Sequence, residues 1–141
     1  EKGIVQSGDL DAEGEKKICE IVKEKFSHDF VFITEYPYSK RPFYHMKEGG
    51  ELTKSFDLIW KGLEITTGAQ REHRYEILKE QALEKGLTLE PIKHYLDFFK
   101  YGCPPHGGCG ISPTRLLMQL LEQKNVREVT FLPRDTERLT P

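Results

Sequence analysis

A glycine-rich segment followed by an arginine has the clearest chemical potential in this sequence. In HGGCGISPTRLLMQLLEQ (residues 106–123), leucines recur with helical spacing after Ser112 and Pro113. Serine is a preferred helix N-cap and proline is preferred at the first helical position, so we predict that a helix begins here with Arg115 in its first turn. A helix N-terminus carries a partial positive charge, which disfavours a cation and favours an anion. The position of this arginine therefore requires an explanation.

Two carboxylates on a predicted hairpin form a second candidate group. SFDLIW and LEIT are predicted as strands joined through Lys61-Gly62, a short connection typical of a hairpin. With a two-residue loop, Ile59 lies opposite Glu64. Asp57 then lies opposite Thr66, and all four side chains share one face. Opposed side chains are about 5 Å apart and diagonal ones about 7 to 8 Å, so Asp57 and Glu64 can share a hard cation through a water. Spacing alone favours a simpler interpretation, the solvated face of an amphipathic hairpin.

The segment TTGAQREHR follows the hairpin and places Arg71 and Arg74 after a glycine. The simplest interpretation is a loop leading to a surface helix, with both arginines solvated. A functional role for the arginines requires that they bind one ligand together with the two carboxylates and the Gly-rich turn before Ser112. That ligand would present Mg²⁺-bound phosphates on one side and a carboxylate on the other.

Three cysteines raise the question of a metal site or a disulfide. Their odd number argues against a disulfide framework, whereas Cys103, His106 and Cys109 in CPPHGGC have the spacing of metal ligands. Structural zinc usually takes four ligands from two separated pairs, and only three candidates are close together here. Reduced thiols in a tight turn are therefore the favoured interpretation.

Length and composition limit the class of protein. The chain has 141 residues, 37% of them hydrophobic, and we expect one globular unit spanning residues 1–141. A net charge of −2 does not predict broad electrostatic binding of nucleic acid. No apolar run approaches the length of a membrane span and the charged N-terminus does not resemble a signal peptide, so we expect a cytoplasmic protein without membrane contact. The first residue is Glu, which indicates an excerpt, a processed chain or a fragment.

The sequence predicts three further helices. Apolar residues recur on one helical face from Asp11, and we expect this helix to end before Ser27. Two more helices are predicted at about residues 75–85 and 91–101, followed by glycines at their C′ positions, Gly86 and Gly102.

The predicted strands cluster around the hairpin. FVFITEYP (residues 30–37) is predicted as a strand buried on both faces and stopped by its proline. Residues 38–54 are predicted as a polar loop with aromatic interruptions, and residues 126–141 as a short strand with an extended end. Strands clustered around a hairpin, with helices grouped afterwards, predict an α+β fold: a mainly antiparallel sheet with flanking helices.

Four segments together resemble one protein family: RPFYHM, SFDLIWKGLEITTGAQREHRYEIL, FKYGCPPHGGCGISPTRLLM and NVREVTFLPRDTERLTP. They resemble the C-terminal part of the catalytic domain of class II aspartyl-tRNA synthetases, of the archaeal or non-discriminating type. Gly108-x-Gly110 with Arg115 resembles motif 3 of this class, and FLPRDTERLTP is much more specific. Related asparaginyl enzymes usually have Lys-Ala-Phe-Tyr where this chain has Arg-Pro-Phe-Tyr, and they lack the Asp-x-x-Arg-Leu-Thr-Pro ending. The resemblance therefore favours aspartate over asparagine.

The resemblance implies an ATP site and explains Arg115. In this family the motif 3 arginine contacts the γ-phosphate of ATP, so the cation and the helix start bind the same anion. Arg115 and Glu64 are the implied catalytic residues. The implied ATP-binding residues are Glu64, Gly108, Gly110, Ser112, Pro113, Thr114 and Arg115. Thr114 stands where the family normally has a glutamate, and Ser112-Pro113 replaces a Gly-x pair, so the ATP edge of this site departs from the family pattern.

The resemblance also implies ligands for Mg²⁺ and for aspartate. The implied metal ligands are Glu64, Thr67 and Asp57. The implied aspartate ligands are Thr67, Arg71 and Arg41, of which Arg71 binds the side-chain carboxylate of the substrate. Strict alternation places Thr66 rather than Thr67 on the face of Glu64, so these roles require a bulge or a strand end just before Gly68.

The implied function is that of an aspartate–tRNA ligase, which activates L-aspartate with ATP and transfers it to tRNA. GDLDAEGEKK (residues 8–17) resembles the family sequence that follows motif 2, so motifs 1 and 2 and the anticodon-binding domain are not expected in this chain. We therefore expect a fragment of a homodimeric parent that is inactive alone. Two alternatives remain: an aspartyl-synthetase-like paralogue that makes asparagine from an aspartyl-adenylate and ammonia, and a non-catalytic module with a synthetase fold.

Overall fold

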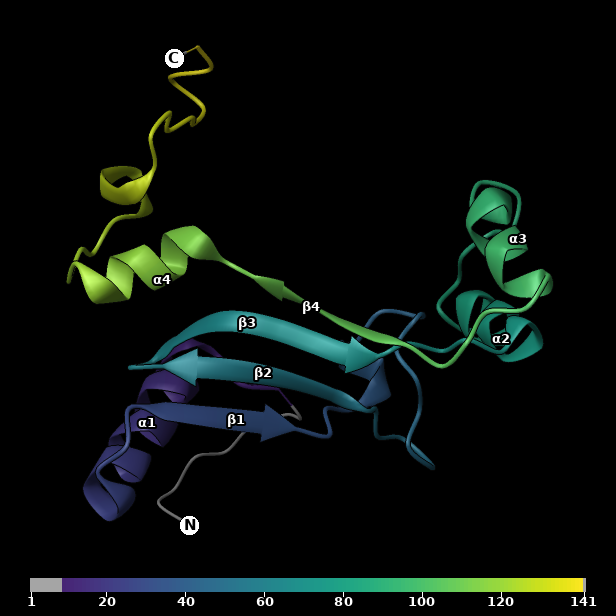
Figure 1. The fold of residues 1–141 in the computed structure, drawn as a ribbon, viewed down its shortest axis with the longest axis horizontal. Helices are drawn as coiled ribbons and strands as arrows, with labels where there is room; N and C mark the ends of the chain where they lie inside the picture. The colour runs from purple at the N-terminus through teal and green to yellow at the C-terminus, as the bar shows by residue number, and fades with distance from the viewer. Residues whose placement is uncertain (1–8, 141) are drawn as a thin grey trace.

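A four-stranded antiparallel sheet forms the centre of the fold, with the strands side by side in chain order (Figure 1). The computed structural model describes residues 9–140, so residues 1–8 and 141 of the predicted unit lie outside it. The strands are β1 (Phe30–Thr34), β2 (Ser55–Trp60), β3 (Leu63–Gln70) and β4 (Gly107–Ile111). With its flanking helices, this sheet confirms the predicted α+β fold.

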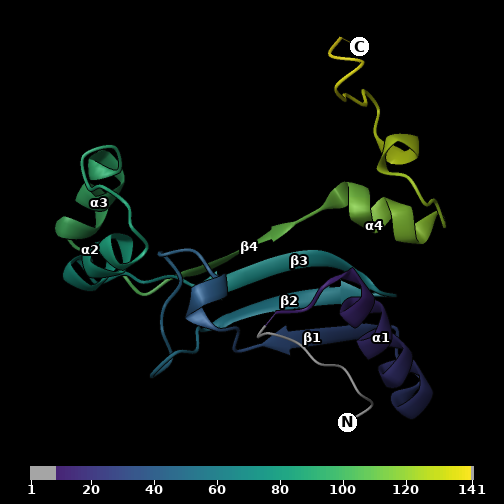
Figure 2. The same ribbon diagram turned by 180° about the vertical axis from the view of Figure 1, so that it is seen from behind.

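Helix α1 (Ala12–Phe26) packs on β1, β2 and β3, and it lies in front of the sheet when the molecule is seen from behind (Figure 2). The Asp11 side chain caps it by accepting a 2.7 Å hydrogen bond from the Gly14 N–H. The helix ends at Ser27, which adopts the left-handed conformation with φ 55°. The sequence therefore predicted both ends of this helix correctly.

The other helices lie at opposite ends of the sheet (Figure 1). Helices α2 (Tyr75–Glu84) and α3 (Lys93–Lys100) pack on each other at one end, around a core of Leu78, Leu96 and Phe99. Helix α4 (Pro113–Leu120) follows β4 at the other end. Gly86 and Gly102 follow the ends of α2 and α3 with φ of 75° and 101°, as predicted, although α3 begins two residues later than expected. No helix within residues 9–140 is long and apolar enough to cross a membrane.

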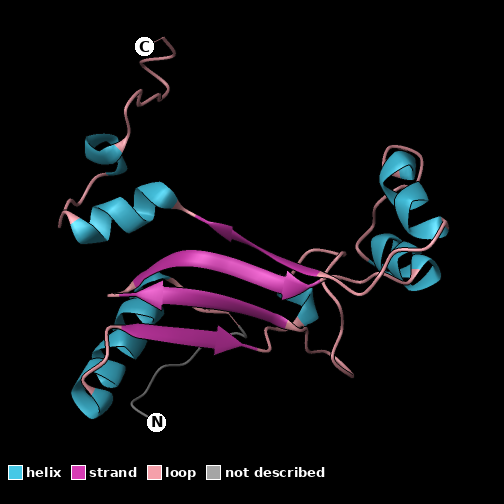
Figure 3. Cartoon of the chain, in the orientation of Figure 1, coloured by secondary structure: helices cyan, strands magenta, loops and turns pink. Residues whose placement is uncertain are grey.

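Three predictions about strands were wrong. β1 ends at Thr34, and Phe32 on its outer face is 61% exposed because α1 covers only the other face of this edge strand. The segment after α4 forms no strand among the described residues; it contains a 3₁₀ turn at Val126–Val129. The predicted Gly-rich turn is instead strand β4, drawn in magenta at the sheet edge (Figure 3).

The β2–β3 hairpin contains a bulge that changes which side chains share a face. Lys61-Gly62 form the predicted two-residue loop, and Ile59 pairs with Glu64 as expected. Leu58, however, pairs with Thr66, which leaves Ile65 as the extra residue. Asp57 therefore lies opposite Thr67, and the predicted pairing with Thr66 was wrong.

The bulge satisfies the requirement that the family resemblance imposed, but at Ile65 rather than directly before Gly68. It returns Thr67 to the face that Glu64 occupies, because the extra residue shifts the alternation by one. Gly68 has another role: a Cβ at this position would lie 2.8 Å from the Cβ of Cys109, so the close approach of β4 requires glycine.

Candidate functional site

Arg41 connects two of the predicted site residues on one face of the sheet. Its Nη2 donates to Oδ2 of Asp57 at 2.5 Å and its Nη1 donates to the Thr67 hydroxyl at 3.2 Å. The Arg41 and Asp57 side chains are only 13% and 8% exposed. Arg41 Nε and Asp57 Oδ1 are buried without a hydrogen-bond partner among the described residues. Buried unpaired polar atoms are costly, so this cluster retains capacity for a polar ligand.

The Tyr36 ring packs against the Arg41 guanidinium. The guanidinium carbon of Arg41 lies 3.7 Å from the centroid of the buried Tyr36 ring. Burial raises the pKa of Tyr36, and the adjacent Asp57 carboxylate raises it further. Tyr36 is therefore a neutral phenol at physiological pH, and it fixes the plane of the Arg41 guanidinium by a cation–π contact. Sequence analysis did not single out Tyr36, because nothing in TEYP indicates that its ring lies under an arginine.

Arg115 and Glu64 form the second part of the site. Ser112 caps α4 by accepting a hydrogen bond from the Arg115 N–H at 3.3 Å, and Pro113 occupies the first helical position, as predicted. The Arg115 guanidinium reaches across to β3, where Nη1 donates to the Glu64 carbonyl at 2.8 Å and to Glu64 Oε1 at 3.1 Å. The cation at the helix N-terminus is therefore held by acceptors on the neighbouring strand.

Glu15 is an additional acidic residue near this pair. Burial raises the pKa of its carboxyl group, a hydrogen bond with the Glu64 backbone opposes the rise, and the charge of Glu64 adds to it. Asp57 also contributes by charge repulsion. The negative charges of Glu64 and Asp57 therefore reach the Glu15 carboxyl group from neighbouring strands. Sequence analysis did not assign Glu15 to the site.

Most of the residues predicted to bind ATP and the metal line one hollow of about 480 Å³. Those that line it are Glu64, Thr67, Gly110, Ser112, Pro113 and Arg115. A Cβ at Gly110 would meet nothing within 4 Å, so it would project into open space that a ligand can occupy. Thr114 does not line this hollow; it lines a neighbouring one of about 650 Å³.

Arg71 lies on the same side of the sheet as Thr67, just beyond the end of β3. Its guanidinium carbon is 4.8 Å from the centroid of the Tyr44 ring, and an added Cβ at Gly108 would lie 3.7 Å from its Nη2. It lines an aromatic hollow of about 500 Å³ together with His106. Arg71 is therefore packed within the molecule, and the interpretation as a solvated surface arginine does not fit its position.

His45 is a buried residue that experiences the charges of both Arg71 and Arg41. It is 5% exposed, and its Nδ1 has no hydrogen-bond partner among the described residues. Its backbone lies directly opposite Arg71 in an antiparallel bridge. Burial, followed by the charges of Arg71 and Arg41, lowers the pKa of His45 to about 4, so both arginines act on this ring. His45 is neutral at physiological pH and leaves the positive charge to the arginines.

Arg74 differs from Arg71 in its surroundings. Its guanidinium forms two hydrogen bonds with the fully buried Glu72, at 2.8 and 2.7 Å. This pair stabilises the chain where it enters α2. Of the two arginines in TTGAQREHR, only Arg71 lies in the candidate site.

The cysteine segment does not form a metal site. Cys103 Sγ lies 3.6 Å from His106 Nδ1, but Cys109 is exposed on β4. Within residues 9–140, no group of three or more His, Cys, Asp or Glu side chains is positioned to hold a metal ion. None of the three cysteines forms a disulfide in the structure, and Cys109 lies on β4 rather than in the predicted tight turn.

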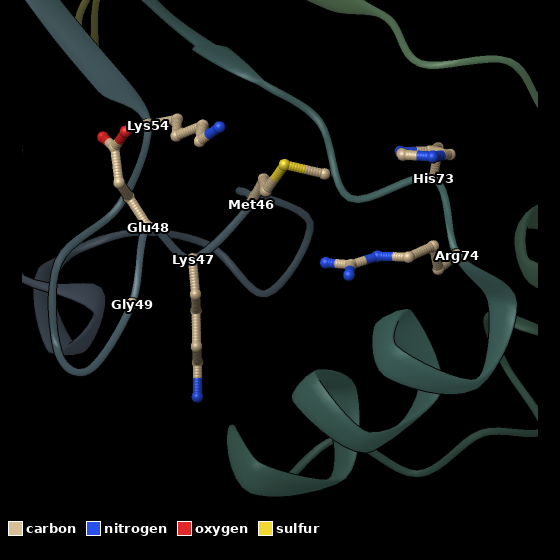
Figure 4. Close-up of a pocket in the computed structure, with 7 residues that line it drawn as sticks. All are labelled: Met46, Lys47, Glu48, Gly49, Lys54, His73 and Arg74. Carbon is tan, nitrogen blue, oxygen red and sulfur yellow. The ribbon is translucent and has the colours of Figure 1, made fainter.

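A basic hollow of about 390 Å³ lies outside this site (Figure 4). Lys47, Lys54, His73 and Arg74 are its basic lining residues. Lys47 is paired with Glu84 at 2.7 Å and Arg74 with Glu72 at 2.7 Å, so much of its positive charge is neutralised. It is therefore a poor candidate for a strong anion site.

Comparison with known proteins identifies the class to which this fold and site belong. The family model described as tRNA synthetases class II (D, K and N) matches residues 2–136. The chain therefore belongs to the class II tRNA synthetases of this group.

Three proteins similar to this chain are aspartate–tRNA ligases or synthetases. The chain is 52% identical to an aspartate–tRNA(Asp/Asn) ligase of Aeropyrum pernix, over 99% of the chain and 32% of that protein. It is 48% identical to an aspartate–tRNA(Asp) ligase of Pyrococcus furiosus, with the same coverage of 99% and 32%. An aspartyl-tRNA synthetase structure from Entamoeba histolytica superposes with a TM-score of 0.92 at 38% identity, covering 99% of this chain and 29% of the other. The chain thus spans about a third of the length of these relatives.

Proposed function

We propose that this chain supplies the motif 3 half of the ATP and aspartate site of an aspartate–tRNA ligase. The observation that carries the proposal is the arrangement along β3 around the Ile65 bulge. Glu64 bonds Arg115 on one side, and Thr67 bonds Arg41 on the other, on the same face of the sheet. One strand therefore presents a phosphate-binding group and a carboxylate-binding group within reach of a single bifunctional ligand.

The ATP end of the proposed site consists of β4 and the start of α4. Arg115 and the α4 N-terminus together favour a polyphosphate anion. The residues assigned to ATP are Glu64, Gly108, Gly110, Ser112, Pro113, Thr114 and Arg115. When ATP binds, its γ-phosphate replaces Glu64 as the principal partner of Arg115. Glu64 then becomes available for a cation.

Glu64, Thr67 and Asp57 are the residues that would hold Mg²⁺. Carboxylate and hydroxyl oxygens are ligands suited to this hard ion, and Mg²⁺ commonly takes only one or two protein carboxylates together with substrate phosphates. The unpaired Asp57 Oδ1 and the mutual repulsion of the nearby carboxylates fit such an ion. When bound, Mg²⁺ neutralises charge on the phosphates.

The acid end of the proposed site consists of Arg71, Arg41 and Thr67. Arg71 pairs with the side-chain carboxylate of L-aspartate, and its stacking on Tyr44 orients the guanidinium. Arg41 is fixed by Tyr36 and Asp57, so little conformational entropy is lost when it contacts the substrate. Asparagine lacks the negative charge that these two cations require, so the site favours aspartate.

The proposed reaction has two steps. The α-carboxylate of aspartate attacks the α-phosphorus of ATP, which forms aspartyl-adenylate and releases pyrophosphate. A hydroxyl group at the tRNA 3′ end then attacks the aspartyl carbonyl, and AMP leaves. Neither step needs a protein nucleophile, because catalysis rests on positioning and charge neutralisation.

The whole protein would carry out this function as a cytoplasmic homodimer that binds tRNA. Residues 1–141 would form the C-terminal portion of its catalytic domain, and the isolated portion would be inactive. Exchange of labelled pyrophosphate into ATP tests the proposal. The whole protein should catalyse exchange in the presence of aspartate and far less with asparagine. Equal exchange with both amino acids, or none with aspartate, would contradict it.

A further inference from the structure

The loop that carries Arg41 and His45 is held by helix α2. This segment, residues 38–47, is here called the Arg41 loop, and it contains only a short 3₁₀ turn at Tyr38–Lys40. The side-chain amide of Gln81 is 2% exposed, and its Nε2 donates to the carbonyls of Phe43 and His45, the latter at 3.1 Å. One buried amide group therefore satisfies two carbonyls of the loop.

Other contacts from α2 hold the ends of the Arg41 loop. The Tyr38 hydroxyl donates to the backbone carbonyl of Gln81 at 3.1 Å. Lys85, just after the helix, donates to the Tyr38 carbonyl at 2.6 Å, and Lys47 pairs with Glu84 at 2.7 Å. The Lys47–Glu84 pair is largely solvated and contributes little, whereas the bonds of Gln81 are buried. Gln81 is thus the central attachment between α2 and the loop.

The attachment lies next to both proposed carboxylate-binding arginines. Arg41 precedes the two bonded carbonyls by two and four residues. The loop backbone next to these carbonyls forms hydrogen bonds with the residues on either side of Arg71. The Glu72 N–H donates to the Tyr44 carbonyl at 2.9 Å, and the Met46 N–H donates to the Gln70 carbonyl at 3.0 Å. A shift of residues 43–46 would therefore disturb the backbone around both arginines.

We infer that Gln81 is a positioning residue for recognition of the acidic amino acid, acting through the Arg41 loop. This inference rests on the proposed function. Gln81 does not touch the substrate; it fixes the backbone from which Arg41 reaches Asp57 and Thr67. The role depends on hydrogen-bond donors, because Gln81 Oε1 has no partner among the described residues while Nε2 has two. A carboxylate or a thioether of similar size at this position supplies no such donors.

Two variants and one matched control test the inference in the whole protein. Gln81→Glu and Gln81→Met remove the donors and keep approximate size, and Glu80→Gln alters an exposed neighbour on the same helix. Loss of the two buried bonds should raise KM for aspartate by roughly tenfold or more, with KM for ATP changed less than about twofold. Lys85→Met, which removes the peripheral hydrogen bonds to the Tyr38 and Ser39 carbonyls, should act in the same direction with a smaller effect.

A second measurement separates loop attachment from substrate binding. Backbone hydrogen exchange in peptides that cover residues 38–47 should be faster in both Gln81 variants, without faster exchange across β2 and β3. Unchanged loop exchange, or equal increases in KM for aspartate and ATP, would overturn the inference and leave a merely structural glutamine. If the unaltered protein shows no aspartate-dependent exchange of pyrophosphate, the proposed function itself is wrong and the inference falls with it.

Discussion

Arg115 donates through Nη1 both to the carbonyl oxygen of Glu64 and to its carboxylate, at 2.8 and 3.1 Å. The two residues are 51 positions apart in the chain, and β4 and the start of α4 bring them together. A cation in the first turn of a helix is disfavoured by the helix dipole, so Glu64 supplies the negative charge that this position requires. A polyphosphate would supply more negative charge than Glu64, so it can replace Glu64 as the partner of Arg115.

The first prediction concerns Arg115. In the whole protein, Arg115→Ala should weaken ATP use by on the order of 2 to 3 kcal/mol, because a phosphate loses a charge-assisted partner. Arg115→Lys should restore only part of the loss, since a point charge lacks the guanidinium fork. KM for ATP in aspartate-dependent exchange measures the effect. Arg127→Ala, which removes an exposed arginine paired with Asp135, is the control. Unchanged ATP dependence in Arg115→Ala would refute the motif 3 assignment.

The start of α4 was predictable from local sequence, whereas β4 was not. Ser112 and Pro113 determine a helix start within one turn, so their pattern is sufficient. Glycine has low strand propensity, and Gly107–Ile111 forms a strand because its backbone pairs with β3. The Ile65 bulge could not be predicted from side-chain alternation either, because alternation assumes a period of two along the whole strand. Only the family resemblance required it.

The site residues show the same difference between features set by local sequence and features set by tertiary contacts. The resemblance assigned Glu64, Thr67 and Arg71 from their motif positions. The structure places Glu64 and Thr67 on one face of the sheet and Arg71 just beyond the end of β3. The Tyr36 platform under Arg41 depends on how a long loop folds back on β2, and no periodicity encodes that contact. Sequence therefore predicts groups that lie on regular elements or in motifs, and misses groups that tertiary contacts assemble.

The second prediction concerns Tyr36. Tyr36→Phe keeps the ring beneath Arg41 and should have a small effect on KM for aspartate. Tyr36→Leu removes the cation–π contact, worth about 0.5 to 2 kcal/mol, so KM for aspartate should rise by roughly 2- to 30-fold. Exchange assays with varied aspartate compare the two variants. If Phe and Leu are equally impaired, the hydroxyl group rather than the ring supports Arg41.

The third prediction uses the pKa of His45. Burial, with the charges of Arg71 and Arg41, lowers this pKa from its usual 6.5 to about 4, so the unfolded chain binds a proton at a higher pH than the folded chain. Stability should therefore be intact above about pH 6.5 and should fall as the pH drops toward 4, by up to about 3 kcal/mol from this residue. His45→Gln cannot titrate and should lose less stability between pH 7 and pH 5. Thermal unfolding of both proteins at these pH values measures the difference, and parallel losses would contradict the assignment.

The last prediction concerns Arg71 and selectivity for the acid. Aspartate and asparagine have nearly the same shape and differ by one charge, so a site separates them strongly only by pairing that charge with a fixed cation. Arg71 is packed against Tyr44 beneath the glycines of β4, which suits it for this role. Truncating one partner of a buried ion pair costs several kcal/mol, so Arg71→Leu in the whole protein should depress aspartate activation by roughly two or more powers of ten.

The same Arg71→Leu variant should change ATP affinity much less, because Arg115 and α4 remain intact. Aspartate-dependent exchange at saturating ATP, in a variant whose thermal unfolding matches that of the unaltered protein, gives the comparison. Arg127→Leu serves as the control, since that side chain is 55% exposed and pairs with Asp135 rather than with a proposed ligand. A loss smaller than about threefold in Arg71→Leu, which corresponds to less than about 1 kcal/mol, would exclude Arg71 as the carboxylate ligand.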